Sequence, residues 1–119
     1  CWVWFEDTYA QRANVLKGDI NTLKKIFWGY VDVRDVAQAC RLAVESEDPT
    51  PHDAFFITAR DTFADAASLE LIRTHYPEVR RVSKAFLDEP HHGLISIAKA
   101  RTFLGYDPQY SWRPSLGQH

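Results

Sequence analysis

The sequence predicts an α/β fold in which a βαβ unit carries a small helical lobe. Residues 30–46, YVDVRDVAQACRLAVES, change at Asp35 from a strand pattern to the period of an amphipathic helix. A second apolar run, AFFIT at 54–58, follows that helix after a loop with two prolines and suits a strand covered on both faces. Strand, helix and strand joined by short connections form a βαβ unit.

The segments before this unit predict a strand and a helical turn. CWVW at 1–4 is short, apolar and aromatic, which fits a buried strand and, at this length, also a helix. A helical turn is expected at 10–16, closed by Gly18. IFWGYVDV at 26–33 has the β-branched and aromatic residues of a strand, interrupted at Gly29.

The helix predicted from Asp35 has one apolar face. Val36, Cys40 and Val44 share that face, and the charge of Asp35 suits the positive end of the helix dipole. The helix is expected to end before EDPTPHD at 47–53, because proline cannot continue it. Cys40 is therefore expected to be a buried thiol, which indicates a reducing, cytoplasmic setting.

Two further helices are predicted in the second half of the chain. The first covers 65–76 and stops at Pro77. The second begins at Ser96 as its N-cap, turns Phe103 inward and ends at Gly105.

The composition indicates an ordinary globular protein of one domain. The chain has 119 residues, of which 45% are hydrophobic and 25% charged, enough for a modest core. The formal net charge is -2, and basic residues gather only at 23–25 and 79–84, runs too short to follow a phosphate backbone. No stretch reaches the roughly 20 apolar residues that span a bilayer. We therefore expect neither a nucleic acid nor a membrane as partner.

The residues of several catalytic and cofactor sites are missing from the sequence. The glycines are dispersed, so neither a dinucleotide fingerprint nor a P-loop is present. No tyrosine is followed four residues later by a lysine, as a short-chain dehydrogenase dyad requires. We expect no catalytic, cofactor-binding or metal-binding residue in this chain.

Two pairs of polar residues have both a structural and a functional explanation. His91 and His92 favour solvated loop imidazoles over metal ligands, because adjacent side chains rarely bind one ion. Asp32 and Asp35 form either a catalytic carboxylate pair or two structural residues. In the structural explanation, which we favour, Asp32 points out of a strand and Asp35 serves the helix start.

Aromatic residues stand at the ends of the predicted strands. Trp2, Trp4, Trp28 and Tyr30 are of the kind that fills a core. Ligands, however, bind at the carboxyl ends of strands in α/β sheets, so the same residues also fit a substrate wall.

Three motifs, in this order, resemble the extended short-chain dehydrogenase/reductases, the NAD-dependent epimerase/dehydratase family. They span roughly residues 28 to 114, and their order makes them more specific together than singly. The motifs are YVDVRDVAQACRLAVES, which resembles the family's strand-helix element, AFFITARDT, which resembles its following strand, and LISIAKARTFLGYDPQYSWRP, which resembles its C-terminal signature.

The resemblance implies that residues 1–119 are a single C-terminal substrate-binding lobe of a longer, Rossmann-like enzyme. NAD or NADP, the catalytic tyrosine and the lysine would lie upstream, so this chain alone is expected to be inactive and to bind no cofactor. Its partners would be a small-molecule substrate and either the missing Rossmann half or a second copy. Substrate contacts are expected from Trp4, Trp28, Tyr30 and Arg34.

One departure from the family pattern bears on the substrate. In the family's nucleotide-sugar epimerases, an arginine that holds the diphosphate commonly stands two residues before the tyrosine of YVDV, where this chain has Trp28. An indole carries no charge, which favours a less charged carbonyl or sugar-like substrate. Arg80 and Arg81 are the other candidates for that charge, although both are expected at the surface. The alternative to an enzyme lobe is a stand-alone, non-catalytic α/β module for binding or dimerisation.

Overall fold

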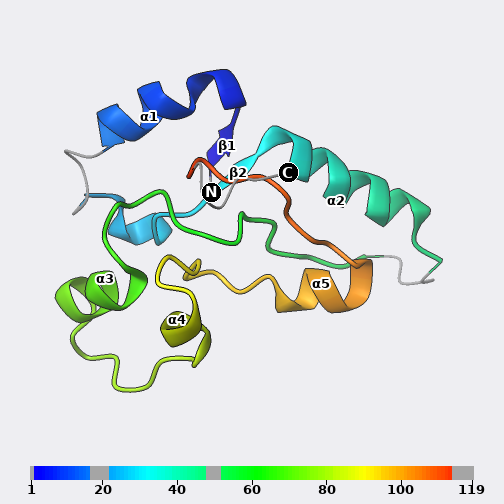
Figure 1. Ribbon diagram of the computed structural model, residues 1–119. Coiled ribbons are helices and arrows are strands. Elements are labelled where there is room, and N and C mark those ends of the chain that lie inside the picture. The colour runs from blue at the N-terminus through cyan, green and yellow to red at the C-terminus, as the bar shows by residue number, and fades with distance from the viewer. Residues whose placement is uncertain (1, 17–21, 48–51, 114–119) are drawn as a thin grey trace.

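The computed structural model describes residues 2–16, 22–47 and 52–113, which form a small mixed α/β fold. Its centre is a two-stranded parallel sheet with helices to either side (Figure 1). In chain order the strands and helices are β1 (Trp2–Trp4), the 3₁₀ helix η1 (Glu6–Thr8), α1 (Tyr9–Leu16), the 3₁₀ helix η3 (Thr22–Ile26), β2 (Tyr30–Asp32), α2 (Val33–Glu45), α3 (Ser68–His75), α4 (Ala85–Asp88) and α5 (Ala98–Leu104).

The sheet confirms a strand within the segment 1–4, but the predicted burial holds only for Trp4, since Trp2 and Val3 are exposed. Strands β1 and β2 pair in parallel, with Trp2 opposite Tyr30. On the other side of β2 the Ala59 amide donates to the Tyr30 carbonyl at 2.8 Å. Within the described ranges no segment hydrogen-bonds to the outer edge of β1. The sheet therefore has one edge open to a further strand.

The strand predicted at 54–58 is wrong. These residues form no strand, and Phe56 is 71% exposed. Phe55 and Ile57 pack against the cluster between α2 and α5, so the apolar run is covered on one side only. The parallel partner of β2 lies upstream in β1 instead, which changes the predicted order of the βαβ unit.

The strand predicted at 26–33 forms only over Tyr30–Asp32. The residues between η3 and β2 make a turn in which Phe27 and Trp28 have φ of 55° and 52°. Bulky residues seldom adopt this left-handed conformation. The turn places Trp28 in the core, where its side chain is fully buried.

The predicted helices are present with shifted starts. The turn predicted at 10–16 forms as α1, although Gly18 lies outside the described residues. Helix α3 begins at Ser68 rather than at residue 65. Ser96 does not occupy the N-cap position of α5, but its Oγ accepts the Ala98 amide at 3.2 Å. No helix in the described part of the chain is long and apolar enough to cross a membrane.

The end predicted for the third helix is confirmed. Gly105 follows α5 with φ of 73°, the left-handed conformation that suits glycine at a helix C-terminus. Its amide donates to the Arg101 carbonyl at 3.1 Å.

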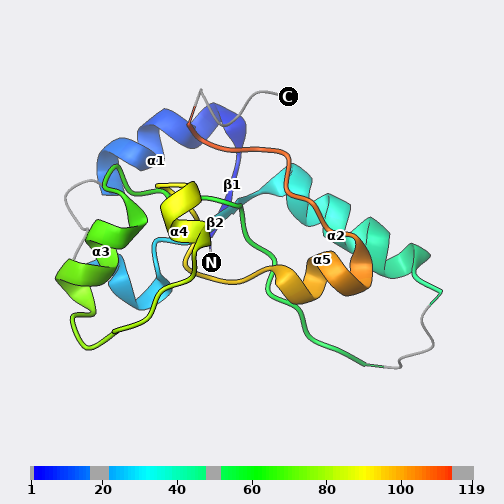
Figure 2. The same cartoon turned by 60° about the horizontal axis from the view of Figure 1, so that its bottom comes forward.

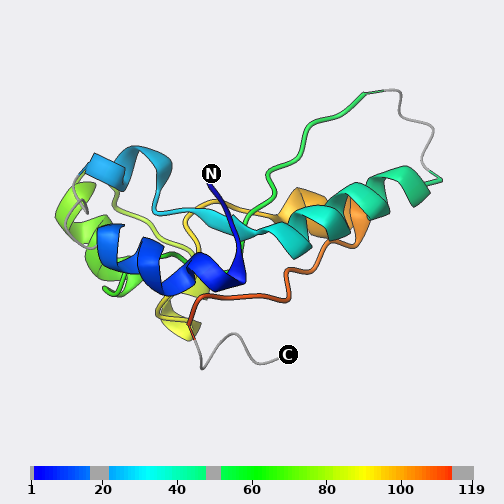
Figure 3. The same ribbon diagram turned by 90° about the horizontal axis from the view of Figure 1, so that it is seen from above.

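Two apolar clusters flank the sheet. Helices α2 and α5 lie side by side on one flank, while α1, α3 and α4 gather on the other (Figures 2 and 3). The smaller cluster lies between α2 and α5, and the larger one surrounds the sheet on the side of α3. The members of the larger cluster that are buried are Trp4, Leu23, Trp28, Tyr30, Ala59, Phe63, Ala64 and Leu71.

Three predicted core positions on two helices are wrong because the buried stripes are rotated. On α2 the buried residues are Asp35 and Ala39, so Cys40 is exposed and Val44 is 86% exposed. On α5 the buried residue is Ala100, and Phe103 is 58% exposed. The buried faces of the two helices are therefore formed by a carboxylate, Asp35, and by the small residues Ala39 and Ala100. Apolar periodicity alone does not predict such faces.

Candidate functional site

The three predicted aromatic contacts lie in the core. Trp4, Trp28 and Tyr30 are all 0% exposed. The ring centroids of Trp4 and Tyr30 are 4.8 Å apart, and the Trp28 ring lies 5.1 Å from that of His75. Their substrate-binding role stays a prediction, and the observed packing gives all three a structural role in this chain.

The Tyr30 hydroxyl joins a buried polar network. It donates to Asp61 Oδ1 at 2.7 Å and accepts the Trp112 amide at 3.0 Å. Ser111 Oγ and Arg113 each donate to Asp61 Oδ2 at 2.7 Å. Burial, together with the charge of Asp61, raises the pKa of Tyr30 well above its ordinary value, so the phenol remains a donor.

Arg34, the fourth predicted contact, lies at the surface and is committed to other residues. Its Nε donates to Asp32 Oδ1 at 2.8 Å, and its Nη1 donates to Glu6 at 3.2 Å. The guanidinium also stacks on the Tyr110 ring, 3.6 Å from its centroid. The structure therefore does not bring Arg34 together with the buried aromatic residues in one pocket.

The predicted orientation of Asp32 is wrong. Its side chain is fully buried. As the N-cap of α2 it accepts the Arg34 amide at 2.8 Å. The Tyr9 hydroxyl donates to the same carboxylate. Desolvation raises the pKa of Asp32, but the hydrogen bonds from Arg34 and Tyr9 outweigh it and leave the pKa below its ordinary value.

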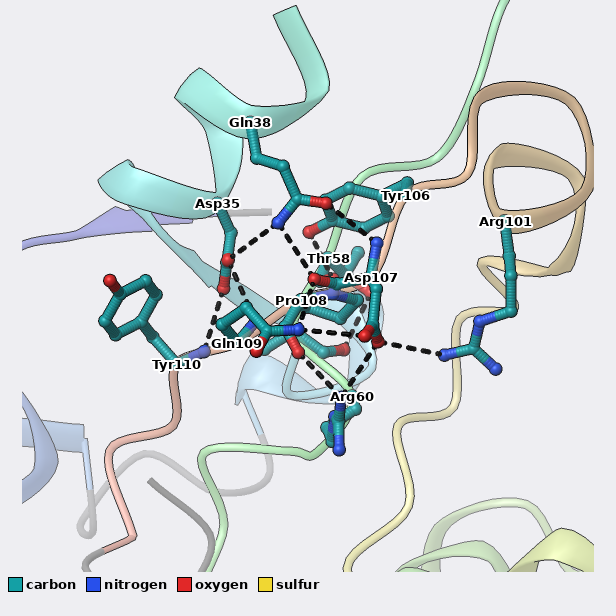
Figure 4. A network of polar contacts seen from close by, with 11 residues as sticks. Asp35, Gln38, Thr58, Arg60, Arg101, Tyr106, Asp107, Pro108, Gln109 and Tyr110 are labelled. Carbon is teal, nitrogen blue, oxygen red and sulfur yellow. Dashed lines mark hydrogen bonds and ion pairs between the residues drawn. The ribbon is translucent and has the colours of Figure 1, made fainter. Parts of the chain in front are cut away.

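Asp35 stands in the first turn of α2, as predicted, and ties that helix to the C-terminal segment (Figure 4). Its two carboxylate oxygens accept the amides of Gln109 at 2.9 Å and Tyr110 at 3.1 Å. Gln38, one turn later, donates to the Asp107 carbonyl and accepts the Asp107 amide, both at 2.8 Å. Burial raises the pKa of Asp35 above its ordinary value. Asp32 and Asp35 thus both accept hydrogen bonds from backbone amides, which is a structural role.

The candidate site is a hollow that a short antiparallel contact builds beside α5. The Thr62 amide donates to the His91 carbonyl at 3.0 Å, and the Gly93 amide donates to the Arg60 carbonyl at 2.8 Å. Ser68 Oγ, at the start of α3, donates to the His92 carbonyl at 2.6 Å. A Cβ at position 93 would lie 3.4 Å from the carbonyl oxygens of Ala59 and Arg60, which is ordinary van der Waals contact, so the backbone passes close to this segment without requiring glycine.

The hollow has a volume of about 260 Å³ and a mixed lining. Its charged residues are Arg60 and Arg101, its hydroxyls belong to Ser83 and Ser96, and its largest apolar side chain is Phe86. None of the predicted site residues lines it. Two of its walls belong to the second and third family-like motifs, but the sequence does not predict the hollow, because the segments near 60, 85 and 95 meet only in the fold.

A second, more apolar hollow of about 450 Å³ shares the Leu94–Ser96 segment with the first. Phe27 and Phe56 line it, together with Lys25. The segment thus has one hollow that contains two arginines and another that is mainly aromatic and aliphatic.

The two adjacent histidines of the loop are half-buried, so the prediction of solvated imidazoles is wrong. His92 Nδ1 lies 2.8 Å from the Gly93 carbonyl, and its ring packs edge-on to Phe86 with centroids 5.2 Å apart. A carbonyl only accepts, so Nδ1 is the protonated nitrogen in this contact. His91 and His92 belong to no group of three or more metal-ligating side chains within the part of the chain that the structure describes.

No family model, curated protein or solved structure matches the chain. The family resemblance therefore stays a prediction from the three sequence motifs.

Proposed function

We propose that the chain is the substrate-binding C-terminal portion of an NAD- or NADP-dependent extended short-chain dehydrogenase/reductase acting on a sugar-like or carbonyl substrate. The observation that carries the proposal is that its three family-like motifs contact one another. Asp35 of the first motif accepts two backbone amides of the last. Tyr106 of the last motif donates to the Thr58 carbonyl of the second at 2.9 Å. The contacts of Asp35 are partly buried and that of Tyr106 is buried, so the three motifs belong to one packed unit.

The incomplete sheet supports a missing neighbour. Parallel sheets are normally covered on both faces, and a pair of short strands is marginal by itself. Here the two strands have three residues each, and on β1 Trp2 and Val3 are 40% and 42% exposed. A Rossmann-like half would supply the next strand along the open edge of β1 and cover these side chains.

In this proposal the upstream half carries out the chemistry and the described chain binds the substrate. The upstream half holds NAD or NADP, the tyrosine and the lysine, and the described chain supplies a wall that excludes water and orients the substrate. The hollow beside α5 is the concave part of that wall, since it combines an apolar surface with a few polar groups. Alone, the chain binds no cofactor and transfers no hydride.

The exposed apolar side chains also favour a second candidate function. Trp2, Val3 and Phe5, half-exposed around β1, suit a stand-alone module in which a second copy of the chain covers them. Sedimentation velocity on the purified chain distinguishes the two candidates. A stable dimer favours the module, and a monomer favours the enzyme lobe.

The intact mass of the native protein, compared with its coding sequence, tests the main proposal. We expect a longer reading frame with a glycine-rich strand-turn-helix and a tyrosine-lysine dyad upstream of Cys1. The purified longer product should then oxidise or reduce its substrate with NAD or NADP. A reading frame without those segments, or a longer product that binds neither nucleotide, contradicts the proposal.

A further inference from the structure

The hollow beside α5 has a positive charge that no carboxylate in its lining balances. Arg60 and Arg101 line it, and no acidic side chain of the described ranges does. The nearest carboxylate to both is Asp107, just outside the lining (Figure 4). Two guanidinium groups thus share one carboxylate.

The donors of the two arginines are only partly used. One Nη of Arg60 donates to Asp107 Oδ1 at 3.0 Å and to the Pro108 carbonyl at 2.8 Å, which fixes the direction of the guanidinium. Arg101 approaches the same Oδ1 only to 4.0 Å, too far for a hydrogen bond. In the described part of the chain Arg101 makes no hydrogen bond through its side chain. Its fork of donors therefore remains available to a carboxylate or a phosphate.

The rest of the hollow is apolar and small. Phe86, Leu94 and Ile97 line it, and the edge-on contact with His92 holds the Phe86 ring in place. The volume of about 260 Å³ falls just below the range of roughly 300–1,000 Å³ that drug-sized ligands need. A compact molecule with one apolar part fits this size better than a dinucleotide.

We propose that this hollow binds a small organic anion, whose phosphate or carboxylate group is held by Arg60 and Arg101 and whose apolar body lies against Phe86 and Ile97. The inference rests on the proposed function in so far as this anion is the enzyme's substrate or product. The inference also revises the expectation, drawn from Trp28, of a less charged substrate. In this proposal Arg60 and Arg101 supply the positive charge that Trp28 lacks.

Titration of the purified chain with phenyl phosphate, followed by the amide shifts of an NMR spectrum, tests the inference. We expect saturable binding, with the largest shifts at 92–98. Arg101→Gln should weaken binding at least about tenfold, the effect of losing a hydrogen bond to a charged group. Arg41→Gln is the matched control: Arg41 is similarly exposed, at 60% against 57%, and pairs only with Glu45 in the described structure. It should leave the affinity unchanged.

Two further probes separate the parts of the ligand. Inorganic phosphate lacks the apolar body and should bind several-fold more weakly than phenyl phosphate, while benzoate tests whether a carboxylate replaces the phosphate. Equal losses in Arg101→Gln and Arg41→Gln, or no saturation at millimolar phenyl phosphate, would overturn the inference. Because no nucleotide is present in this titration, such a result leaves the proposed hydride transfer standing. Conversely, a longer product without NAD or NADP chemistry leaves a positive titration standing.

Discussion

Replacing Asp35 with alanine is expected to lower the free energy of unfolding by about 2–3 kcal/mol. The carboxylate accepts amides from Gln109 at 2.9 Å and Tyr110 at 3.1 Å, and each hydrogen bond to a charged group contributes about 1.5–3 kcal/mol. Two such bonds sum to about 3–6 kcal/mol, and the expected loss lies at or just below the bottom of that range for two reasons. Gln109 is exposed, so its amide regains water after the substitution, and burial already disfavours the charged form of Asp35.

Urea unfolding at neutral pH, followed by tryptophan fluorescence, measures this loss, since Trp4 and Trp28 are fully buried and become exposed on unfolding. Asp35→Asn retains one acceptor and should lose about 1 kcal/mol. Glu47→Ala, at an exposed loop carboxylate, is the control and should change stability by less than about 0.5 kcal/mol. If Asp35→Ala lies within that same margin of the wild type, water replaces the carboxylate without cost and the reasoning is refuted.

The carboxylate of Asp32 should make stability depend on pH, because its pKa in the folded chain lies below the ordinary value. The charged carboxylate stabilises the fold fully above about pH 4. This stabilisation is lost as the pH falls through the lowered pKa. Acid urea titrations of Asp32→Asn should lack that loss, and an unchanged pH profile argues against the pairing. Gly105→Ala should cost about 1 kcal/mol, since alanine disfavours φ of 73° although no atom lies within 4 Å of the new Cβ; thermal unfolding checks this, and an unchanged Tm contradicts it. In a Cys1→Ser background, exposed Cys40 should react with a maleimide in the folded chain nearly as fast as in urea. Strong protection in the folded state would show that it is buried.

Local sequence signals predicted where helices begin and end better than they predicted which side of each element is buried. The change of period at Asp35 and the glycine at position 105 marked a helix start and a helix end that the structure contains within a few residues. The buried side of α2 was missed, because it is set by amides 74 and 75 residues away from Asp35. The apolar run at 54–58 gave the wrong element, since composition does not reveal that only one side of it is covered.

The candidate site was the least predictable part. Trp4, Trp28 and Tyr30, three of the four predicted contacts, are core residues in the fold, because an aromatic residue at a strand end suits either a core or a ligand wall. Arg60 lies in the second family-like motif and Arg101 in the third, but neither motif marks its arginine as a ligand-binding residue. The two approach each other only in the fold, where both lie near Asp107. A site built from such distant segments leaves no pattern in any one of them.

The network around the Tyr30 hydroxyl has a consequence for how the chain folds during synthesis. Ser111, a partner of the Tyr30 hydroxyl, lies 81 residues after Tyr30 in the sequence. A ribosome that adds about 5–20 residues per second needs roughly 4–16 s to synthesise that interval. Until then β2 has β1 available but lacks the groups that complete the network around its first residue. The core therefore closes late in translation, and a nascent chain stalled before position 111 would leave Asp61 without its Ser111 and Arg113 partners and open to chaperones or proteases.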